Sequence, residues 1–155
     1  MRCAVLTVSD SRTEATDESG PLIRSLLEKA GHVVLRHALL KNDEAKVRAH
    51  VAAWLARGDL QAVLITGGTG LGTKDRTIEA VRPLFEKEFL GFGELFRLLS
   101  YQEQIGTTAI LSRAAAGSAN GAVIVSMPGS RAAVDLAMTR ILIPELPHLL
   151  RELSR

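Results

Sequence analysis

The fold can be predicted from one stretch of the chain, Ala62-Val63-Leu64-Ile65-Thr66-Gly67-Gly68-Thr69-Gly70-Leu71-Gly72. Its first half is a short apolar run rich in branched residues, which is typical of a strand buried on both faces of a sheet. Its second half holds four glycines between Gly67 and Gly72, and glycine permits tight turns that other residues resist. The stretch therefore predicts a buried strand that ends in a compact loop.

Strands and helices alternate around this stretch. Residues 4–8 form an earlier apolar run and residues 32–38 form another. Between them, apolar residues at helical spacing extend from the candidate cap Ser19 to the terminator Gly31. A second helix, which ends at Gly58, also has an apolar face. Such strand-helix-strand units build a parallel sheet with helices on both faces. We therefore expect an α/β fold with three layers, αβα, around a mostly parallel, doubly wound sheet.

The second half of the chain continues this pattern less regularly. No internal repeat, low-complexity tract or long linker divides it, and 46% of the 155 residues are hydrophobic, so a single domain over residues 1–155 is expected. The further elements expected are a helix capped by Thr77 and shortened at Pro83, a helix at 92–100, a strand at 122–125, and a last helix from about Arg131 that Pro144 and Pro147 interrupt.

Composition excludes several classes of function. With a net charge of +2, one Trp and one Tyr, the chain offers neither a basic stripe nor stacking platforms for nucleic acid. No run approaches the roughly 20 apolar residues that span a bilayer, and the amino-terminus lacks a signal-peptide pattern. The lone Cys3 excludes an internal disulfide and is expected in the core. We therefore expect a cytoplasmic protein that binds neither nucleic acid nor membrane.

The glycine loop is the strongest candidate for a binding site, because its backbone can aim several N–H groups at one phosphate or carboxylate. The P-loop pattern is absent, since Lys74 is followed by Asp75, and the dinucleotide fingerprint fails, since its third glycine would fall on Thr73. The alternative is a plain flexible turn, but parallel sheets bind ligands at this position. The candidate residues are Thr66, Gly67, Gly68, Thr69 and Gly70.

Two carboxylates could act beside this loop. Asp75 follows it directly, and Asp43 follows the second expected strand at the same edge of the sheet. We expect both to face the crevice, where they could hold Mg²⁺ against phosphate oxygens. The alternative for Asp43 is a helix cap, because Asn42-Asp43-Glu44 is also a good helix start. Spacing alone favours the cap for Asp43 and leaves both interpretations open for Asp75.

Two further loops should reach the same edge. One follows the first expected strand and the other follows the strand at residues 122–125, so both could supply hydroxyl groups and backbone donors. Either could equally be ordinary turn chemistry. The ligand-binding candidates in these loops are Thr7, Ser9, Asp10, Ser126, Met127, Pro128, Gly129 and Ser130.

Several short sequence motifs occur together in a characteristic order. They are Leu6-Thr7-Val8-Ser9-Asp10, Thr66-Gly67-Gly68-Thr69-Gly70 followed by Asp75, Gly91-Phe92-Gly93-Glu94, and Met127-Pro128-Gly129. In these motifs, and over nearly its whole length, the chain closely resembles the MoaB/Mog family of molybdenum cofactor biosynthesis proteins. The runs Phe92-Gly93-Glu94-Leu95-Phe96-Arg97 and Ile105-Gly106-Thr107-Thr108-Ala109-Ile110-Leu111-Ser112-Arg113-Ala114 are most similar to the MoaB branch.

The resemblance implies a ligand and a reaction. Family members that are molybdopterin adenylyltransferases move AMP from Mg-ATP onto the phosphate of molybdopterin, which prepares the dithiolene for molybdate insertion. The glycine loop would then cradle a phosphate, and Asp43 and Asp75 would match the family's two functional aspartates, with Mg²⁺ as the cofactor. ATP and molybdopterin would be the substrates, and residues 126–130 would help to line the pocket.

One departure from the adenylyltransferase pattern is visible. In Asp75-Arg76-Thr77-Ile78-Glu79, Ile78 stands where those enzymes usually have proline. The change leaves the carboxylates in place but weakens the case for adenylylation. The alternative function is a non-catalytic carrier or scaffold module that binds molybdopterin without transferring AMP to it.

The resemblance also implies a homotrimer or homohexamer, and partners among other molybdenum cofactor biosynthesis proteins. The chain itself contributes one hint, because the apolar segment from Phe92 to Tyr101 is large for a short helix and could form an exposed patch. The alternative for this segment is plain core packing.

Overall fold

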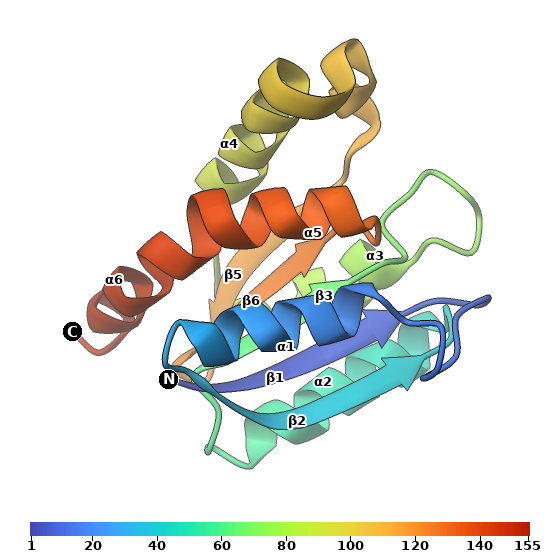
Figure 1. The fold of residues 1–155 in the computed structure, drawn as a ribbon. Helices are drawn as coiled ribbons and strands as arrows, with labels where there is room; N and C mark the ends of the chain where they lie inside the picture. The colour runs from blue at the N-terminus through green and yellow to red at the C-terminus, as the bar shows by residue number, and fades with distance from the viewer.

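The predicted sheet and helices are present in the computed structural model, which describes residues 1–155 (Figure 1). The strands are β1 (Arg2–Val8), β2 (Val33–Leu40), β3 (Ala62–Thr66), β4 (Lys87–Glu88), β5 (Ala115–Ala119) and β6 (Ala122–Met127). The helices are α1 (Ser19–Lys29), α2 (Glu44–Ala56), α3 (Thr77–Val81), α4 (Leu90–Ser100), α5 (Arg131–Ala137) and α6 (Ile143–Leu153). Shorter helical turns are η1 (Arg82–Leu84), η2 (Tyr101–Ile105), η3 (Gly106–Leu111) and η4 (Met138–Leu142).

The sheet has the strand order β2-β1-β3-β6-β5-β4. β1 pairs in parallel with β2 and β3, and β3 pairs in parallel with β6. β5 runs antiparallel to β6 and β4. The expected mostly parallel sheet is thus confirmed, with an antiparallel edge. From β1 the sheet grows toward β2 on one side and toward β3 on the other, so the strand order switches between β1 and β3. Sheets of this kind bind their ligands at such a switch point.

Helices cover both faces of the sheet, which confirms the three-layer prediction. One core joins the sheet to α1, α4, α5 and α6, with Phe96 and Leu64 among its fully buried residues. The other core lies between the sheet and α2 with α3, and includes Trp54 and Val51. In Figure 1, α1 and α5 cross the near face of the sheet and α2 lies behind it. Cys3 is in the first core as expected, and burial raises the pKa of its thiol to about 11.

Sequence reasoning missed β4 and β5. The β5 segment Ala115–Ala119 consists of small residues without a branched side chain, so it lacks the usual strand signal. Its small size has a packing reason, since a Cβ at Gly117 would lie 2.4 Å from Cγ of Phe85. The turn to β6 contains Asn120 and Gly121 at φ 50° and 72°, and this Asn-Gly pair is a hairpin signal that could have identified the strand.

The carboxy-terminal helical region is interrupted before Pro144, whereas the prediction that Pro147 also interrupts it is wrong, because α6 continues through Pro147. α5 ends at Ala137, and the wider turn η4 leads into α6, which has Pro144 in its first turn and Pro147 inside it. A proline lacks the N–H group that the regular helix needs and crowds the carbonyl four residues earlier, so the preceding turn widens. Similarly, α3 ends at Val81 just before Pro83, as predicted. None of the helices is both long and apolar enough to cross a bilayer.

Candidate functional site

The loops after β1, β3 and β6 meet at one edge of the sheet because these strands end in register. Thr7 pairs with Thr66, and Thr66 pairs with Met127. The loops that follow surround the largest cavity of the molecule, with a volume of about 530 Å³. The predicted residues that line it are Thr7, Ser9, Asp10, Thr66, Gly67, Gly68, Thr69, Gly70, Asp75, Pro128 and Gly129.

The glycines of the loop after β3 are required by close backbone approach. Gly67 and Gly68 have positive φ angles of 93° and 65°. A Cβ at Gly67 would lie 2.2 Å from the carbonyl oxygen of Val8, and one at Gly129 would lie 3.1 Å from Cα of Gly67. The Gly67 N–H donates to the carbonyl of Met127 at 3.0 Å. Three loops therefore touch through their backbones, with no room for side chains between them.

The next amides of this loop are free. The N–H groups of Gly68, Thr69 and Gly70 donate no hydrogen bond within the chain, and these residues line the cavity. Successive unpaired amides beside a polar cavity form a nest of partial positive charge that suits an anion. The loop therefore has the donors that the phosphate-cradle prediction requires.

Asp75 follows the glycine loop, and its carboxylate lies against the loop backbone. Its Oδ2 accepts a hydrogen bond from the Gly72 N–H at 3.1 Å, and a Cβ at Gly70 would lie 2.6 Å from the same oxygen. Asp75 also lines the main cavity. Its carboxylate is thus folded under the glycine loop, where it can act both on the loop and on a ligand.

Asp43 lies elsewhere, and the expectation that it faces the same crevice as Asp75 needs correction. It caps α2, because its Oδ1 accepts from the Lys46 N–H at 3.0 Å, and Lys46 Nζ is 3.3 Å from Oδ2. The hydrogen bond from the Lys46 N–H lowers the pKa of Asp43 below its usual value. Asp43 lines a separate hollow of about 460 Å³, which shares Asp10 and Asn42 with the main cavity. The helix-cap alternative is therefore confirmed.

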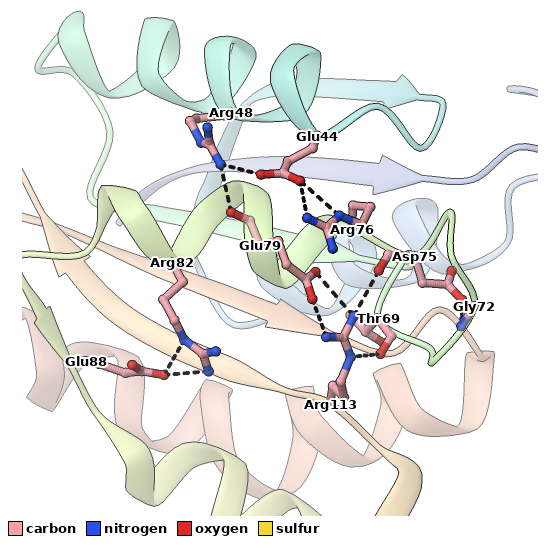
Figure 2. Close-up of polar contacts among 10 residues, drawn as sticks. All are labelled: Glu44, Arg48, Thr69, Gly72, Asp75, Arg76, Glu79, Arg82, Glu88 and Arg113. Carbon is pink, nitrogen blue, oxygen red and sulfur yellow. Dashed lines mark hydrogen bonds and ion pairs between the residues drawn. The ribbon is translucent and has the colours of Figure 1, made fainter.

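Ion pairs join the two segments that carry these aspartates, as Figure 2 shows. Arg76, which follows Asp75, binds Glu44, which follows Asp43, through Nε and Nη2 at 2.9 Å and 2.7 Å. Arg48 Nη2 also contacts Glu44, at 2.7 Å. Hydrogen bonds from Arg76, and then from Arg48, lower the pKa of Glu44. These ion pairs therefore hold the segment that carries Asp75 against the segment that carries Asp43.

Asp17 is a site residue that sequence reasoning missed. Its side chain is only 4% exposed, and its Oδ2 accepts from the Thr7 hydroxyl at 2.7 Å. Its Oδ1 accepts from the N–H groups of Ser19 and Gly20, each at 3.1 Å. The prediction that Ser19 caps α1 is thus wrong, because Asp17 holds the first amides and the Ser19 hydroxyl donates to the Gly129 carbonyl at 2.7 Å. An aspartate just before an apolar helix is the signal that could have found it.

Three of the five residues predicted in the loop at 126–130 do not line the cavity, and two of them, Ser126 and Met127, belong to β6 itself. Ser126 and Met127 are fully buried inside the sheet, and the Ser126 hydroxyl has no hydrogen-bond partner. Ser130 caps α5 by accepting from the Ala133 N–H at 3.1 Å. A related prediction is also wrong, since Thr77 is the first residue of α3 and makes no side-chain cap. Strands end later than their apolar pattern suggests when polar residues fit inside the sheet.

Another part of the cavity wall comes from the turns after α4, which rise beyond the sheet in Figure 1. Sequence reasoning did not assign it. The wall residues are Ile105, Thr108, Leu111 and Ser112.

Comparison with known proteins identifies the family. Residues 4–148 match the family model described as "Probable molybdopterin binding domain". The molybdenum cofactor biosynthesis protein B of Halalkalibacterium halodurans is 54% identical over 155 residues, covering 100% of this chain and 91% of that protein. The chain belongs to the MoaB family. Membership places this MoaB-family chain in molybdenum cofactor biosynthesis and confirms the resemblance seen in the sequence motifs.

Solved structures of MoaB proteins share the fold over the full chain. A crystal structure of a molybdenum cofactor biosynthesis protein B is 49% identical, with a TM-score of 0.95, and the match covers 99% of this chain and 96% of that one. The tungsten cofactor synthesizing protein MoaB of Pyrococcus furiosus is 35% identical, with a TM-score of 0.89 and coverage of 99% and 97%. The three-layer architecture is therefore that of MoaB structures.

Mg²⁺ is the metal that the sequence suggested for this site. The MoaB-family chain gathers no group of three or more His, Cys, Asp or Glu side chains that could hold a metal ion. Mg²⁺ is commonly bound by only one or two carboxylates together with water and substrate phosphates. Asp75 fits that role because it lines the cavity beside the free amides, whereas Asp43 lines the neighbouring hollow and not this cavity.

Proposed function

We propose that this MoaB-family chain binds molybdopterin in the main cavity and transfers AMP to its phosphate from Mg-ATP, in the cytoplasm. The observation that carries the proposal is the set of free N–H groups on Gly68, Thr69 and Gly70 beside a polar cavity. A terminal phosphate satisfies such a nest, because its oxygens accept charge-assisted hydrogen bonds. Asp75 stands at the other end of the same loop.

The reaction needs no side-chain nucleophile. An oxygen of the molybdopterin phosphate attacks the α-phosphorus of ATP, the bond from that phosphorus to the bridging oxygen breaks, and pyrophosphate leaves. The loop amides would hold the attacking phosphate in place, and Asp75, which lines the same cavity, would act on the nucleotide phosphates through a bound cation. Bound Mg²⁺ would supply charge neutralisation across those phosphates and would be held by Asp75 together with the phosphates and water.

A non-catalytic molybdopterin carrier or scaffold is the second candidate, and a specific observation favours it. Asp43 caps a helix, contacts Lys46 and lies outside the main cavity, so one of the two carboxylates is not directed at the ligand. Ile78, which stands where the adenylyltransferases usually have proline, is buried in α3. Binding would then serve delivery to another protein of the pathway.

Assembly into a homotrimer or homohexamer is a further part of the proposal. Phe92 and Phe96 are buried in the chain's own core, which supports the core-packing alternative for these two residues. Leu95, Leu98 and Tyr101, however, are 43%, 50% and 54% exposed on the same segment. These exposed apolar side chains are the part of the segment that an interface between copies would cover.

One anaerobic experiment tests both candidates. Molybdopterin is titrated into the protein in a calorimeter, and pyrophosphate release is then measured after Mg-ATP is added, with EDTA as the metal control. Binding followed by release supports the transferase, and binding without release supports the carrier. Absence of binding would overturn the assignment of the cavity to molybdopterin.

A further inference from the structure

The guanidinium group of Arg113 contacts the glycine loop at its base, between Thr69 and Asp75, as Figure 2 shows. Its Nε donates to the carbonyl oxygen of Thr69 at 2.9 Å, and its Nη2 donates to the carbonyl oxygen of Asp75 at 2.9 Å. These carbonyls stand at the two ends of the turn formed by residues 70–74. One planar group therefore spans the base of the loop.

Glu79 of α3 holds this guanidinium in place. Its Oε1 lies 2.5 Å from Arg113 Nη1, and its Oε2 lies 3.3 Å from Nη2. Both side chains are 29% exposed, so water screens the pair only in part. Arg113 thus makes hydrogen bonds to the loop and to α3 at once, which the rigid fork of arginine permits and the single ammonium of lysine does not.

Backbone hydrogen bonds also close the loop, from the Thr77 N–H to the Gly68 carbonyl and from the Asp75 N–H to the Gly72 carbonyl, each at 3.0 Å. Residues 70–74 are exposed, Leu71 is 69% exposed, and the amides of Gly68 to Gly70 are unpaired. Within the turn, the Gly72 N–H donates to the Asp75 carboxylate. The contacts of Arg113 at Thr69 and Asp75 are the side-chain hydrogen bonds that tie the two ends of this turn to the segment after η3.

We infer that Arg113 is a positioning residue, which fixes the spacing between the phosphate-binding amides and Asp75 and so sets the affinity of the cavity for a phosphorylated ligand. The inference rests on the proposed function, because it takes the free amides as the phosphate site. Arg113 also follows Ser112, which lines the cavity. The same side chain therefore ties the glycine loop to the segment that carries Ser112.

Arg113→Lys is the variant that separates positioning from folding. Lysine keeps the positive charge and can still pair with Glu79, but it cannot span both carbonyls. Arg82→Lys is the matched control, since Arg82 makes a similar two-nitrogen contact with one oxygen of Glu88, at 3.1 Å and 3.0 Å, away from the loop. The urea midpoint confirms that both variants are folded.

Two measurements are made on each protein. The first is the amide spectrum of the glycines by ¹H–¹⁵N NMR, which reports loop geometry without any ligand. The second is the calorimetric affinity for molybdopterin. We expect Arg113→Lys to shift the signals of Gly68, Gly70 and Gly72 and to weaken binding by about ten-fold or more, whereas Arg82→Lys changes neither.

Chemical rescue adds a test that a general loss of stability would not pass. Free guanidinium should restore the loop spectrum and the affinity of Arg113→Ala, whereas methylammonium should not. If Arg113→Ala does not fold, the inference is judged on Arg113→Lys alone. Unchanged glycine signals and unchanged affinity in that variant would overturn it. Absence of binding by the wild-type protein would instead overturn the proposed function, while the spectrum would still decide whether Arg113 sets the loop.

Discussion

Replacement of Gly70 by alanine should displace the Asp75 carboxylate without unfolding the protein. The added Cβ would lie 2.6 Å from Oδ2 and 3.2 Å from Cγ of Asp75, so the carboxylate must withdraw by about 1 Å to reach normal contact. Gly70 has no positive φ, so alanine brings no backbone strain. The variant thus acts through one displaced side chain.

The stability terms nearly cancel. In the wild-type protein the Gly72 N–H donates to Asp75 Oδ2 at 3.1 Å. The variant loses this hydrogen bond, which is worth about 1 kcal/mol. Alanine returns about 0.4–1 kcal/mol by restricting the unfolded chain. We therefore expect the free energy of unfolding to change by less than about 1 kcal/mol. A displacement of about 1 Å in a catalytic group can nevertheless cost about a hundred-fold in rate.

The assay compares Gly70→Ala with Gly91→Ala, at which a Cβ would meet nothing within 4 Å. Pyrophosphate release is measured with molybdopterin and Mg-ATP, and the urea midpoint is measured on the same samples. The control should keep full turnover, whereas Gly70→Ala should lose most of it. Full turnover in a folded Gly70→Ala protein would refute the claim that the position of the Asp75 carboxylate matters.

Three more outcomes are expected. Asp75→Asn, which removes the charge and keeps the size, should lower turnover by about two orders of magnitude with little change in molybdopterin affinity; full activity by the pyrophosphate assay would exclude a catalytic role. Hydrogen bonds from Arg113 hold the pKa of Glu79 below its usual 4.5, so this group contributes stability that is present above pH 4.5 and lost as pH falls through its lower folded pKa. Glu79→Gln should therefore flatten the acid limb of a urea-midpoint profile, and an unchanged slope would contradict the assignment. Light scattering should find an oligomer that Leu98→Glu dissociates, because Leu98 is half exposed on α4; a stable wild-type monomer at micromolar concentration would remove this prediction.

The amino-acid pattern predicted those parts of the fold that depend on neighbours in the chain. Burial and turn geometry are local signals. The apolar run at residues 62–66, the glycines after it and the alternation with helices were therefore sufficient to predict a three-layer fold around a mostly parallel sheet. The position of the loop then follows from the rule that parallel strands share their carboxyl edge. Most candidate residues, including Asp75, lie at the cavity for this reason.

Local signals failed where distant segments compete for the same group. Asp17 rather than Ser19 caps α1, because the end of β1 brings Thr7 to its carboxylate and the loop after β6 brings Gly129 to the Ser19 hydroxyl. The small residues of β5 form a strand because Phe85 and β6 pack against them. Neither contact has a counterpart in local propensity.

The sequence by itself therefore determined the alternation of strands and helices from β1 to β3, the glycine loop and the presence of two aspartates that follow strands of the sheet. The tertiary structure decided what those aspartates do, because it turned Asp43 toward Lys46 in a separate hollow and folded Asp75 under the loop. It also brought Arg113 against Thr69 and Asp75, which lie 44 and 38 positions earlier in the chain. Hydrogen bonds and ion pairs of this kind depend on atomic distances between remote segments, which only the packed sheet and helices establish.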